Sequence, residues 1–400
     1  MKKKFLFWDN PKDAMIFLVL FLMLIGCVNV FSASYVEAKV QFGNAYHYLF
    51  RYLIYAAAGL AAMFFVGYKM DYRSIFSQAK LISFLLFLSL VYVDVFSRSV
   101  KGAQRWIIIG PLSVQPSEFV KLGIIILGAA YLGQLMVRGK EPHLYKSGVN
   151  FAFLVTLAMA ALVYKQPDMG TAAIILTLIL VLYVVAGMPP WEVAAVFGIS
   201  VVSVIAMVMA APYRLNRVKI WLDPWVDAQG YGYQAVQSMV SIGSGGLFGM
   251  HLGMGTGKFY YLPESHTDFA FAIFCQEWGF IGALCLIAIF IRLSVLLYDI
   301  GKETRDRSGY LLVTGVNFLV VGQAIANMAM VCGLLPVIGV PLTFISYGGT
   351  SLVVSLIGIG LVISVYQHEK MDREQLNQPD PVPHFRPYSR VGSSERRWRS

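Results

Sequence analysis

The sequence predicts an all-α integral membrane protein, a polytopic bundle of about ten transmembrane helices with a large outer loop between spans seven and eight. Of the 400 residues, 58% are hydrophobic and only 14% are charged. Continuous apolar runs of about 20 residues recur, which is the length that a helix needs to cross ~30 Å of hydrocarbon. These runs do not alternate apolar with polar residues, so a transmembrane β-barrel is disfavoured.

Ten apolar segments are predicted to span the membrane: 14–33, 49–68, 81–96, 117–136, 149–164, 170–187, 191–211, 269–295, 310–332 and 347–366. The first is longer than the apolar core of a signal peptide, so a retained helix is expected. An even number of spans places both termini on one side. Basic residues concentrate in the loops of that side, which the positive-inside rule makes cytoplasmic.

The chain after the last span changes in composition. Residues 368–400 contain four prolines and end near Arg396-Arg397-Trp398-Arg399. We expect a membrane domain over residues 1–367, followed by a disordered basic cytoplasmic tail over 368–400. The four cysteines lie in or beside apolar runs without metal-ligand spacing, and packing is their expected role.

Two loops on the predicted outer side are basic against the positive-inside rule. The loop 97–116 contains Arg105, and the long loop 212–267 contains Lys258. Cations in these places favour an anionic ligand at the outer face, such as a phosphate-linked lipid. Contact with anionic headgroups, or pairing with carboxylates such as Glu264, would explain the same cations, and charge alone does not separate these alternatives.

The long outer loop has two further features. Residues 213–222 mix basic with aromatic and apolar side chains, which is typical of an element that lies in the membrane interface. Residues 243–258 are rich in glycine and end in Lys258, but the spacing of a nucleotide-binding loop is missing and Phe259 stands where a hydroxyl residue is needed. Nucleotide binding is therefore rejected.

Two polar constellations accompany the apolar spans. Glu118 and Lys121 lie three residues apart at the start of span four, where they would face a ligand or neutralise each other. Asn327 precedes a segment rich in glycine and proline, 333–351, which would line a cavity as a re-entrant loop or would only connect spans nine and ten.

Six motifs resemble, in order and spacing, those of the SEDS family of bacterial cell-wall polymerases, the RodA/FtsW/SpoVE proteins. They are Gly102–Trp106, Gln115–Lys121, Gln166–Thr171, Asp223-Pro224-Trp225, Leu262–Asp268 and Ser346–Ser351. The resemblance covers most of the chain, and Lys258–Glu264 looks more like the FtsW/SpoVE branch than RodA. Gln276 stands before Glu277 where relatives often have two glutamates.

This resemblance implies a peptidoglycan glycosyltransferase that polymerises lipid II at the outer face of the bacterial cytoplasmic membrane. The implied partners are a class B penicillin-binding protein and other divisome or elongasome proteins; no nucleic acid is expected. No metal site and no nucleotide or organic cofactor is predicted, and a divalent cation is left open. Asp268 would be catalytic, and the expected substrate-binding residues are Arg105, Trp106, Glu118, Lys121, Lys258 and Glu264.

The residue types fit this chemistry. In lipid II the sugar leaves with a diphosphate, so the enzyme needs a base for the acceptor hydroxyl and positive charge for the departing phosphates. One carboxylate with nearby arginine or lysine suffices. In this family the donor linkage is α and the polymer is β, which fits a single in-line displacement.

Asp268 has a specific alternative role. Ser265-His266-Thr267-Asp268 has the spacing of a capping box, in which the Asp268 carboxylate would accept the backbone N–H of Ser265 at the start of span eight. Spacing alone makes the two roles equal, and the resemblance favours catalysis. Glu277 is expected ~13 Å deeper along the same helix, too far to share the proton transfer.

A transporter or flippase for a lipid-linked precursor is the alternative function. Carriers place ionisable groups near the bilayer midplane, between symmetry-related halves with broken helices. In this sequence the charged residues gather at the predicted outer mouth, and Glu277, Gln323 and Asn327 are the polar residues expected deeper. A polymerase is therefore preferred over a transporter, and both over a scaffold without catalytic activity.

Overall fold

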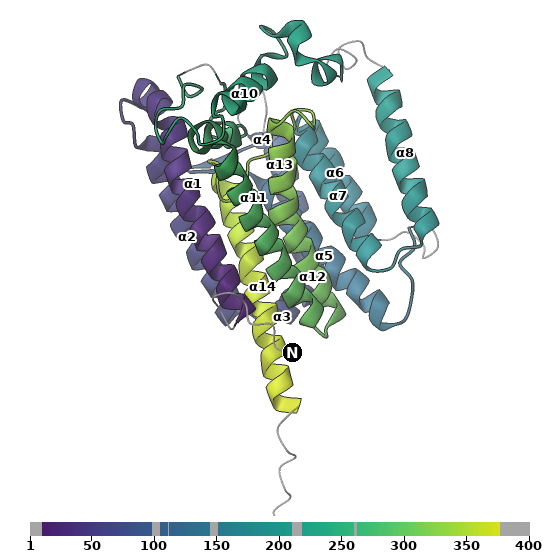
Figure 1. The fold of residues 1–400 in the computed structure, drawn as a ribbon. Coiled ribbons are helices and arrows are strands. Elements are labelled where there is room, and N and C mark those ends of the chain that lie inside the picture. Colours follow the sequence, from purple (N-terminus) through teal and green to yellow (C-terminus); the bar gives the residue numbers. More distant parts are fainter. Residues whose placement is uncertain are drawn as a thin grey trace, which may run out of the picture.

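The computed structural model describes residues 10–97, 105–110, 112–144, 151–209, 218–259 and 262–376, which form a helical bundle (Figure 1). Every predicted span coincides with a helical segment. These segments are α1 (Pro11–Phe42), α2 (His47–Lys69), α4 (Ala79–Phe96), α5 (Pro116–Val137), α6 (Phe151–Lys165), α7 (Met169–Val185), α8 (Pro190–Met209), α11 (Ala270–Glu303), α12 (Arg307–Asn317) continued by η2 (Phe318–Gly322) and α13 (Gln323–Val331), and α14 (Gly349–Leu376). In the part of the chain that the structure describes, seven helices are long and apolar enough to cross a membrane by themselves.

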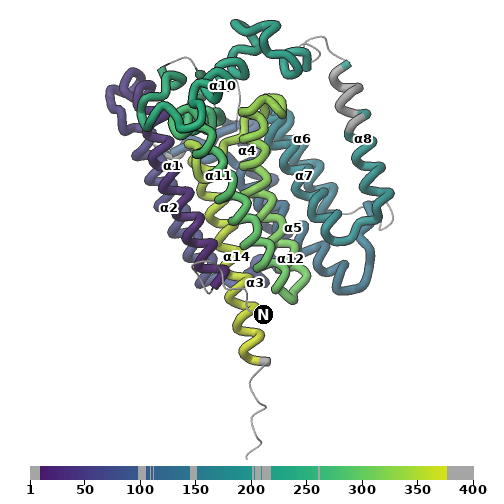
Figure 2. The backbone as a smooth tube through the Cα atoms, in the orientation of Figure 1, coloured from purple at the N-terminus to yellow at the C-terminus, as the bar shows by residue number. Residues whose placement is uncertain are grey.

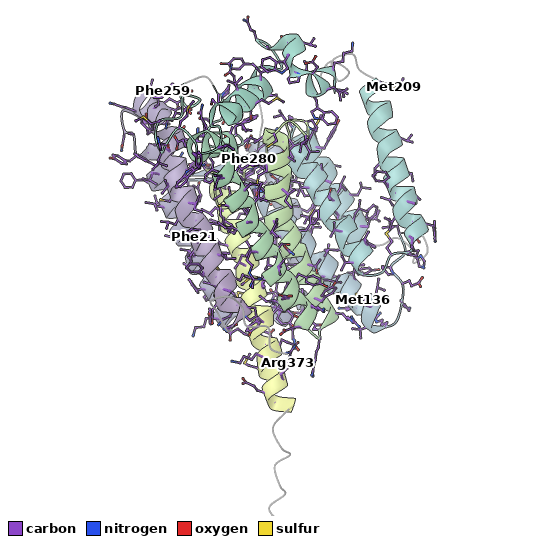
Figure 3. All side chains as sticks on the ribbon, viewed as in Figure 1. Phe21, Met136, Met209, Phe259, Phe280 and Arg373 are labelled. Atoms are coloured by element: carbon purple, nitrogen blue, oxygen red, sulfur yellow. The ribbon has the colours of Figure 1, made fainter. Side chains whose placement is uncertain are left out.

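The two ends of the bundle differ. The long loop between α8 and α11 covers one end and contains η1 (Pro224–Asp227) and α10 (Tyr233–Ser244), whereas α14 protrudes from the other end (Figure 1). We call these the loop end and the tail end. Figure 3 shows Phe259 at the loop end and Arg373 at the tail end.

Helix packing in the bundle depends on small residues. A Cβ at Gly360 of α14 would lie 2.6 Å from the Met63 carbonyl oxygen of α2, and a Cβ at Gly59 would lie 2.5 Å from a methyl group of Leu356. Because these positions carry no side chain, α2 and α14 approach each other closely. Small residues allow close helix approach in membrane bundles generally, because van der Waals packing rather than the hydrophobic effect drives helix association in lipid.

Large apolar side chains cover the outside of the bundle. Phe65 on α2 is 60% exposed, Phe84 on α4 is 57% exposed, and Phe21 lies on the outer face of α1 (Figure 3). Apolar surface of this extent is unfavourable in water but matches the hydrocarbon of a bilayer. The arrangement confirms the polytopic, all-α class.

Helix α8 stands apart from the other helices (Figures 1 and 2). At its tail end, Glu192 in the first turn accepts a hydrogen bond from the Leu144 backbone N–H at 2.9 Å and pairs with His143. The Glu192 side chain is buried. This contact attaches the start of α8 to the segment that follows α5.

Helix α11 is kinked at Gly279, whose φ of 69° and ψ of −171° are not helical. The glycine-rich segment packs against this kink: Met250 N–H donates to the Gln276 carbonyl, and Phe280 N–H donates to the Gly246 carbonyl, both at 2.9 Å. The loop thus satisfies backbone groups that the kink frees. A Cβ at Gly249 would lie 2.1 Å from the Glu277 carbonyl oxygen, so its glycine serves close backbone approach.

Three features differ from the prediction. A short antiparallel hairpin, β1 (Ile107–Ile109) and β2 (Leu112–Val114), and a six-residue helix, α3 (Tyr72–Ser77), were not expected. The boundary of the predicted tail is wrong, because α14 continues to Leu376 and Arg373 donates to Glu369 at 3.1 Å. Residues 377–400 of that tail, and residues 213–217 of the predicted interfacial element, lie outside the described residues.

Candidate active site

Asp268 lies at the loop end, two residues before the first residue of α11. The N-cap of α11 is Phe269, which makes no side-chain cap, and Ser265 Oγ instead donates to the Ala33 carbonyl at 3.3 Å. The helix therefore begins after Asp268, so Ser265 is not the N-cap of α11 that the capping-box alternative assumed. Asp268 is half-buried, so part of this residue remains exposed at the loop end.

Two segments distant in sequence pack around Asp268. Asn327 on α13 donates its Nδ2 to the Asp268 carbonyl at 2.7 Å. The Asp268 Oδ2 atom lies 3.6 Å from where a Cβ of Gly339 would stand, so the loop 332–348 passes directly beside the carboxylate. Asn327 and this loop therefore lie beside Asp268 at the candidate site.

Hydrogen bonds around Glu264 stabilise a turn in the segment that precedes Asp268. Glu264 adopts a left-handed φ of 53°, its carbonyl accepts the N–H groups of Thr267 and Phe269 at 3.2 Å each, and its Oε2 accepts from Thr267 Oγ1 at 3.0 Å. These bonds form a compact turn that fixes the backbone immediately before Asp268. Glu264 itself stays half-buried, which is compatible with the predicted substrate contact.

His266 attaches this turn to α1 and α2. Its Nδ1 lies 3.2 Å from Glu37 Oε2, its ring centroid lies 4.3 Å from that of Tyr48, and its carbonyl accepts from Tyr347 N–H at 2.9 Å. The His266 side chain is buried among these groups. The position of Asp268 therefore depends on α1, α2 and the segment that directly precedes α14.

A pocket of about 250 Å³ opens between α2 and the β hairpin. It is lined by Arg51, Trp106, Ile108, Leu112 and Ser113. The Arg51 side chain also hydrogen-bonds to Tyr347, and Tyr347 in turn binds the His266 carbonyl. A continuous set of contacts thus connects the pocket with the segment that ends at Asp268.

Arg51 is the residue of this pocket that the sequence analysis missed. It falls within predicted span two, where it was counted as part of an apolar run. A positive charge two residues inside such a run, at its predicted outer end, runs against the positive-inside rule and was a usable signal for a functional site. Trp106, a predicted substrate-binding residue, also lines this pocket.

Arg105 contacts the segment that precedes α7. Its Nε donates to the Gln166 carbonyl at 2.8 Å, its guanidinium also reaches the Pro167 carbonyl, and Nη1 lies 3.9 Å from Asp168 Oδ2. Asp168 is buried and caps α7 by accepting from Thr171 N–H at 3.1 Å. Arg105 is therefore engaged with protein groups, and its side chain is 29% exposed.

Glu118 and Lys121 neutralise each other inside the bundle. Lys121 Nζ lies 2.8 Å from Glu118 Oε2, and both side chains are buried. The Lys121 ammonium also donates to Gln323 Oε1 at 2.7 Å. The geometry matches the self-neutralising alternative, because the pair is buried among protein groups.

Lys258 is not the accessible outer cation that the sequence predicted. Its Nζ lies 2.6 Å from Glu277 Oε1 and 3.1 Å from Ser32 Oγ, and both charged side chains are fully buried. The ammonium also lies 5.1 Å from the ring centroid of Tyr35. Of the two alternatives weighed for the outer cations, Lys258 follows the carboxylate pairing, although with Glu277 rather than Glu264.

The expected distance between Glu277 and Asp268 is not changed by the kink. The kink at Gly279 follows Glu277, so residues 270–278 form continuous helix between the two carboxylates. Within the described ranges, no three His, Cys, Asp or Glu side chains gather closely enough to hold a metal ion. Asp268 thus stands as the candidate reactive carboxylate of this site.

Comparison with known proteins agrees with these motifs. A family model described as a cell cycle protein, that of FtsW, RodA and SpoVE, matches residues 13–371. This chain belongs to the FtsW/RodA/SpoVE family. The resemblance to the SEDS proteins, drawn from six motifs, is therefore confirmed.

Relatives within the FtsW/RodA/SpoVE family align over nearly their whole length. Stage V sporulation protein E of Bacillus subtilis is 34% identical over 90% of this chain and 98% of its own. A probable peptidoglycan glycosyltransferase FtsW of Coxiella burnetii is 35% identical over 91% of this chain and 98% of its own. These two proteins represent the FtsW/SpoVE branch, which the motifs favoured.

Solved structures of the family share the fold. A chain in a structure described as "Structural coordination of polymerization and crosslinking by a peptidoglycan synthase complex" superposes with a TM-score of 0.74 at 28% identity, covering 91% of this chain and 99% of that one. The rod shape determining protein RodA of Thermus thermophilus superposes with a TM-score of 0.64 at 27% identity, covering 89% and 96%. This family member is therefore a bacterial membrane protein with the same bundle.

Proposed function

We propose that this chain is a peptidoglycan glycosyltransferase that polymerises lipid II into glycan strands for cell division. The observation that carries the proposal is the half-buried Asp268 carboxylate, which is connected through His266 and Tyr347 to the pocket of Arg51 and Trp106. The name of its FtsW relative, a probable peptidoglycan glycosyltransferase, supports the same activity.

The proposed reaction is one displacement at the anomeric carbon of the donor sugar. The acceptor hydroxyl oxygen forms the new bond to that carbon, and its proton passes to the Asp268 carboxylate. The bond between the carbon and the diphosphate oxygen breaks, and the lipid diphosphate leaves with the electron pair. Attack opposite to the leaving group inverts the α linkage to β, so one carboxylate base is sufficient.

Positive charge is needed where the diphosphate departs. Arg51 in the pocket and the partly exposed Arg105 are two cations that lie near this end of the bundle. A guanidinium can bind two phosphate oxygens at once, which stabilises the negative charge as it develops. Lys121 and Lys258 are already paired with carboxylates, so we assign them to structural support.

The proposed orientation places the loop end outside the cytoplasmic membrane and both termini in the cytoplasm. Lipid II would then reach Asp268 from the side on which peptidoglycan is made. The partner transpeptidase would be a class B penicillin-binding protein, in line with the described peptidoglycan synthase complex that shares the fold. We expect further divisome proteins to join this pair.

The deciding experiment is polymerisation of lipid II by the purified full chain with its partner transpeptidase. The wild type should form glycan strands, and Asp268→Asn should form none while remaining folded and bound to its partner, because an amide is not a useful base. A vesicle assay for movement of lipid II across the bilayer separates the transporter alternative. Polymerisation by Asp268→Asn near the wild-type rate would reject the catalytic assignment.

A further inference from the structure

Asn327 joins the two segments that meet at Asp268. It lies in the middle of α13 with a fully buried side chain. Its Nδ2 donates to the Asp268 carbonyl at 2.7 Å and to the Val340 carbonyl at 2.6 Å. The first carbonyl belongs to the entry of α11 and the second to the loop 332–348, so one amide group holds both backbones together.

The loop is shaped to lie against the carboxylate. Gly339, next to Val340, has a left-handed φ of 65°, and its missing Cβ would stand 3.6 Å from Asp268 Oδ2. A residue with a side chain adopts this backbone conformation only at a cost. The two hydrogen bonds of Asn327 therefore fix the distance between the Asp268 backbone and a loop that borders its carboxylate.

A second amide on the same helix face supports the loop. Gln323, one turn before Asn327, donates its Nε2 to the Pro341 carbonyl at 3.1 Å, and its Oε1 accepts from Lys121. The pair of Lys121 with Glu118 thus orients Gln323, which holds the residue next to the one that Asn327 holds. The buried Glu118–Lys121 pair therefore contacts the loop 332–348 through Gln323.

We propose that Asn327 is a positioning residue for Asp268. It holds the Asp268 backbone against the loop 332–348 and so sets where the carboxylate lies relative to the acceptor hydroxyl. The proposal rests on the proposed function, in which Asp268 is the base. Because a displacement of about 1 Å can lower a rate by ~10²-fold, the effect of losing Asn327 should fall on the chemical step.

The test compares Asn327→Ala and Asn327→Leu in the purified full chain with its partner transpeptidase. Leucine fills the site and also removes the buried Oδ1 atom, which has no hydrogen-bond partner in the described part of the chain, so it guards against a failure of the alanine variant to fold. We expect kcat for lipid II polymerisation to fall by about 10- to 100-fold, with KM changed by less than about threefold.

Asn29 provides a matched control. It is also a buried asparagine, and it lies on α1. Its Nδ2 donates at 3.2 Å to the carbonyl of Ala270, which is two residues after Asp268. Asn29→Ala should lose a similar amount of thermal stability but keep the wild-type kcat. A loss of kcat in the Asn327 variants alone therefore reports positioning rather than stability.

Two results would overturn the inference. One is a wild-type kcat in a folded Asn327 variant, and the other is an equal loss of kcat in Asn29→Ala. The Asp268→Asn protein separates this failure from that of the proposed function. If Asp268→Asn is inactive while the Asn327 variants are fully active, only the positioning role is rejected; if Asp268→Asn polymerises, the proposed function fails and this inference with it.

Discussion

Lys258 and Glu277 form an ion pair of 2.6 Å in which neither side chain is exposed. Lys258 comes from the glycine-rich part of the long loop and Glu277 from α11, and Ser32 of α1 donates to the Glu277 carboxylate at 2.6 Å. The pair therefore fixes the loop to two helices of the bundle. Burying both charges requires that each has its partner, because a lone charge in this interior lacks compensating solvation.

Removing one partner of this pair should destabilise the protein strongly. For Lys258→Met or Glu277→Gln we expect a loss of about 3–5 kcal/mol, because an unpaired charge or an orphaned partner is left buried. The double variant should recover much of this loss. Denaturation of the purified proteins in detergent gives the free energy of unfolding of each variant, which is compared with that of the wild type.

An exposed ion pair serves as the control for that measurement. Lys165 lies 2.7 Å from Asp94 with its side chain 68% exposed, so Lys165→Met should cost at most about 1 kcal/mol. The double variant of Lys258 and Glu277 should also regain lipid II turnover. A double variant that is stable yet inactive would indicate that Lys258 binds substrate and would contradict its structural role.

Arg51 should contribute to substrate binding. Arg51→Ala is expected to raise KM for lipid II by about 10- to 100-fold, the range for losing a charge-assisted hydrogen bond of about 1.5–3 kcal/mol. Tyr347→Phe removes the partner of Arg51 but keeps its charge, and should change KM less. Kinetics of polymerisation by the purified complex decide the matter, and an unchanged KM in Arg51→Ala would exclude a phosphate contact.

The sequence predicts the helices better than the site because different information defines them. Each span is an apolar run whose length is read locally, so all ten coincide with helical segments. The burial of Lys258 depends instead on Ser32, which is 226 positions away in the sequence. Charge placement alone favoured an accessible cation as much as a cation paired with a carboxylate. Asp268 and Trp106 were proposed as site residues from motifs, whereas Arg51 was hidden within an apolar span.

The kink in α11 and the β hairpin could not be predicted from local sequence patterns either. The chain has 36 glycines, and composition does not say which of them adopts a left-handed backbone within a helix. Gly279 does so because the glycine-rich loop supplies partners for the freed backbone groups. The β hairpin has strands of three residues each, too short for an alternating pattern to be recognised.

The orientation of the bundle is testable by reporter fusions. Fusions after Lys140 or Arg305 should report the cytoplasm, and fusions near Gly243 in the long loop should report the exterior, because basic residues concentrate in the former loops. Activity of a cytoplasmic reporter near Gly243 would contradict the orientation. It would also remove Asp268 from the side on which lipid II is proposed to be polymerised.

Gly279 should be one of the least tolerant glycines of the bundle. Its φ of 69° and ψ of −171° lie in a region that only glycine adopts readily. A Cβ there would stand 2.3 Å from the Gly249 backbone nitrogen, and backbone cannot move aside as a side chain can. Gly279→Ala must therefore straighten α11 or displace the glycine-rich loop.

Either response would break the hydrogen bonds from Phe280 to Gly246 and from Met250 to Gln276. We expect Gly279→Ala to lose about 3 kcal/mol or more of stability, since backbone strain and unpaired buried groups add. Gly198 on α8 has no atom within 4 Å of its would-be Cβ, so Gly198→Ala should be as stable as the wild type. Thermal unfolding and protease cleavage within residues 243–259 compare the two variants. Equal midpoints and equal cleavage would show that the contact between kink and loop contributes little, and that the conformation of Gly279 is not required for the fold.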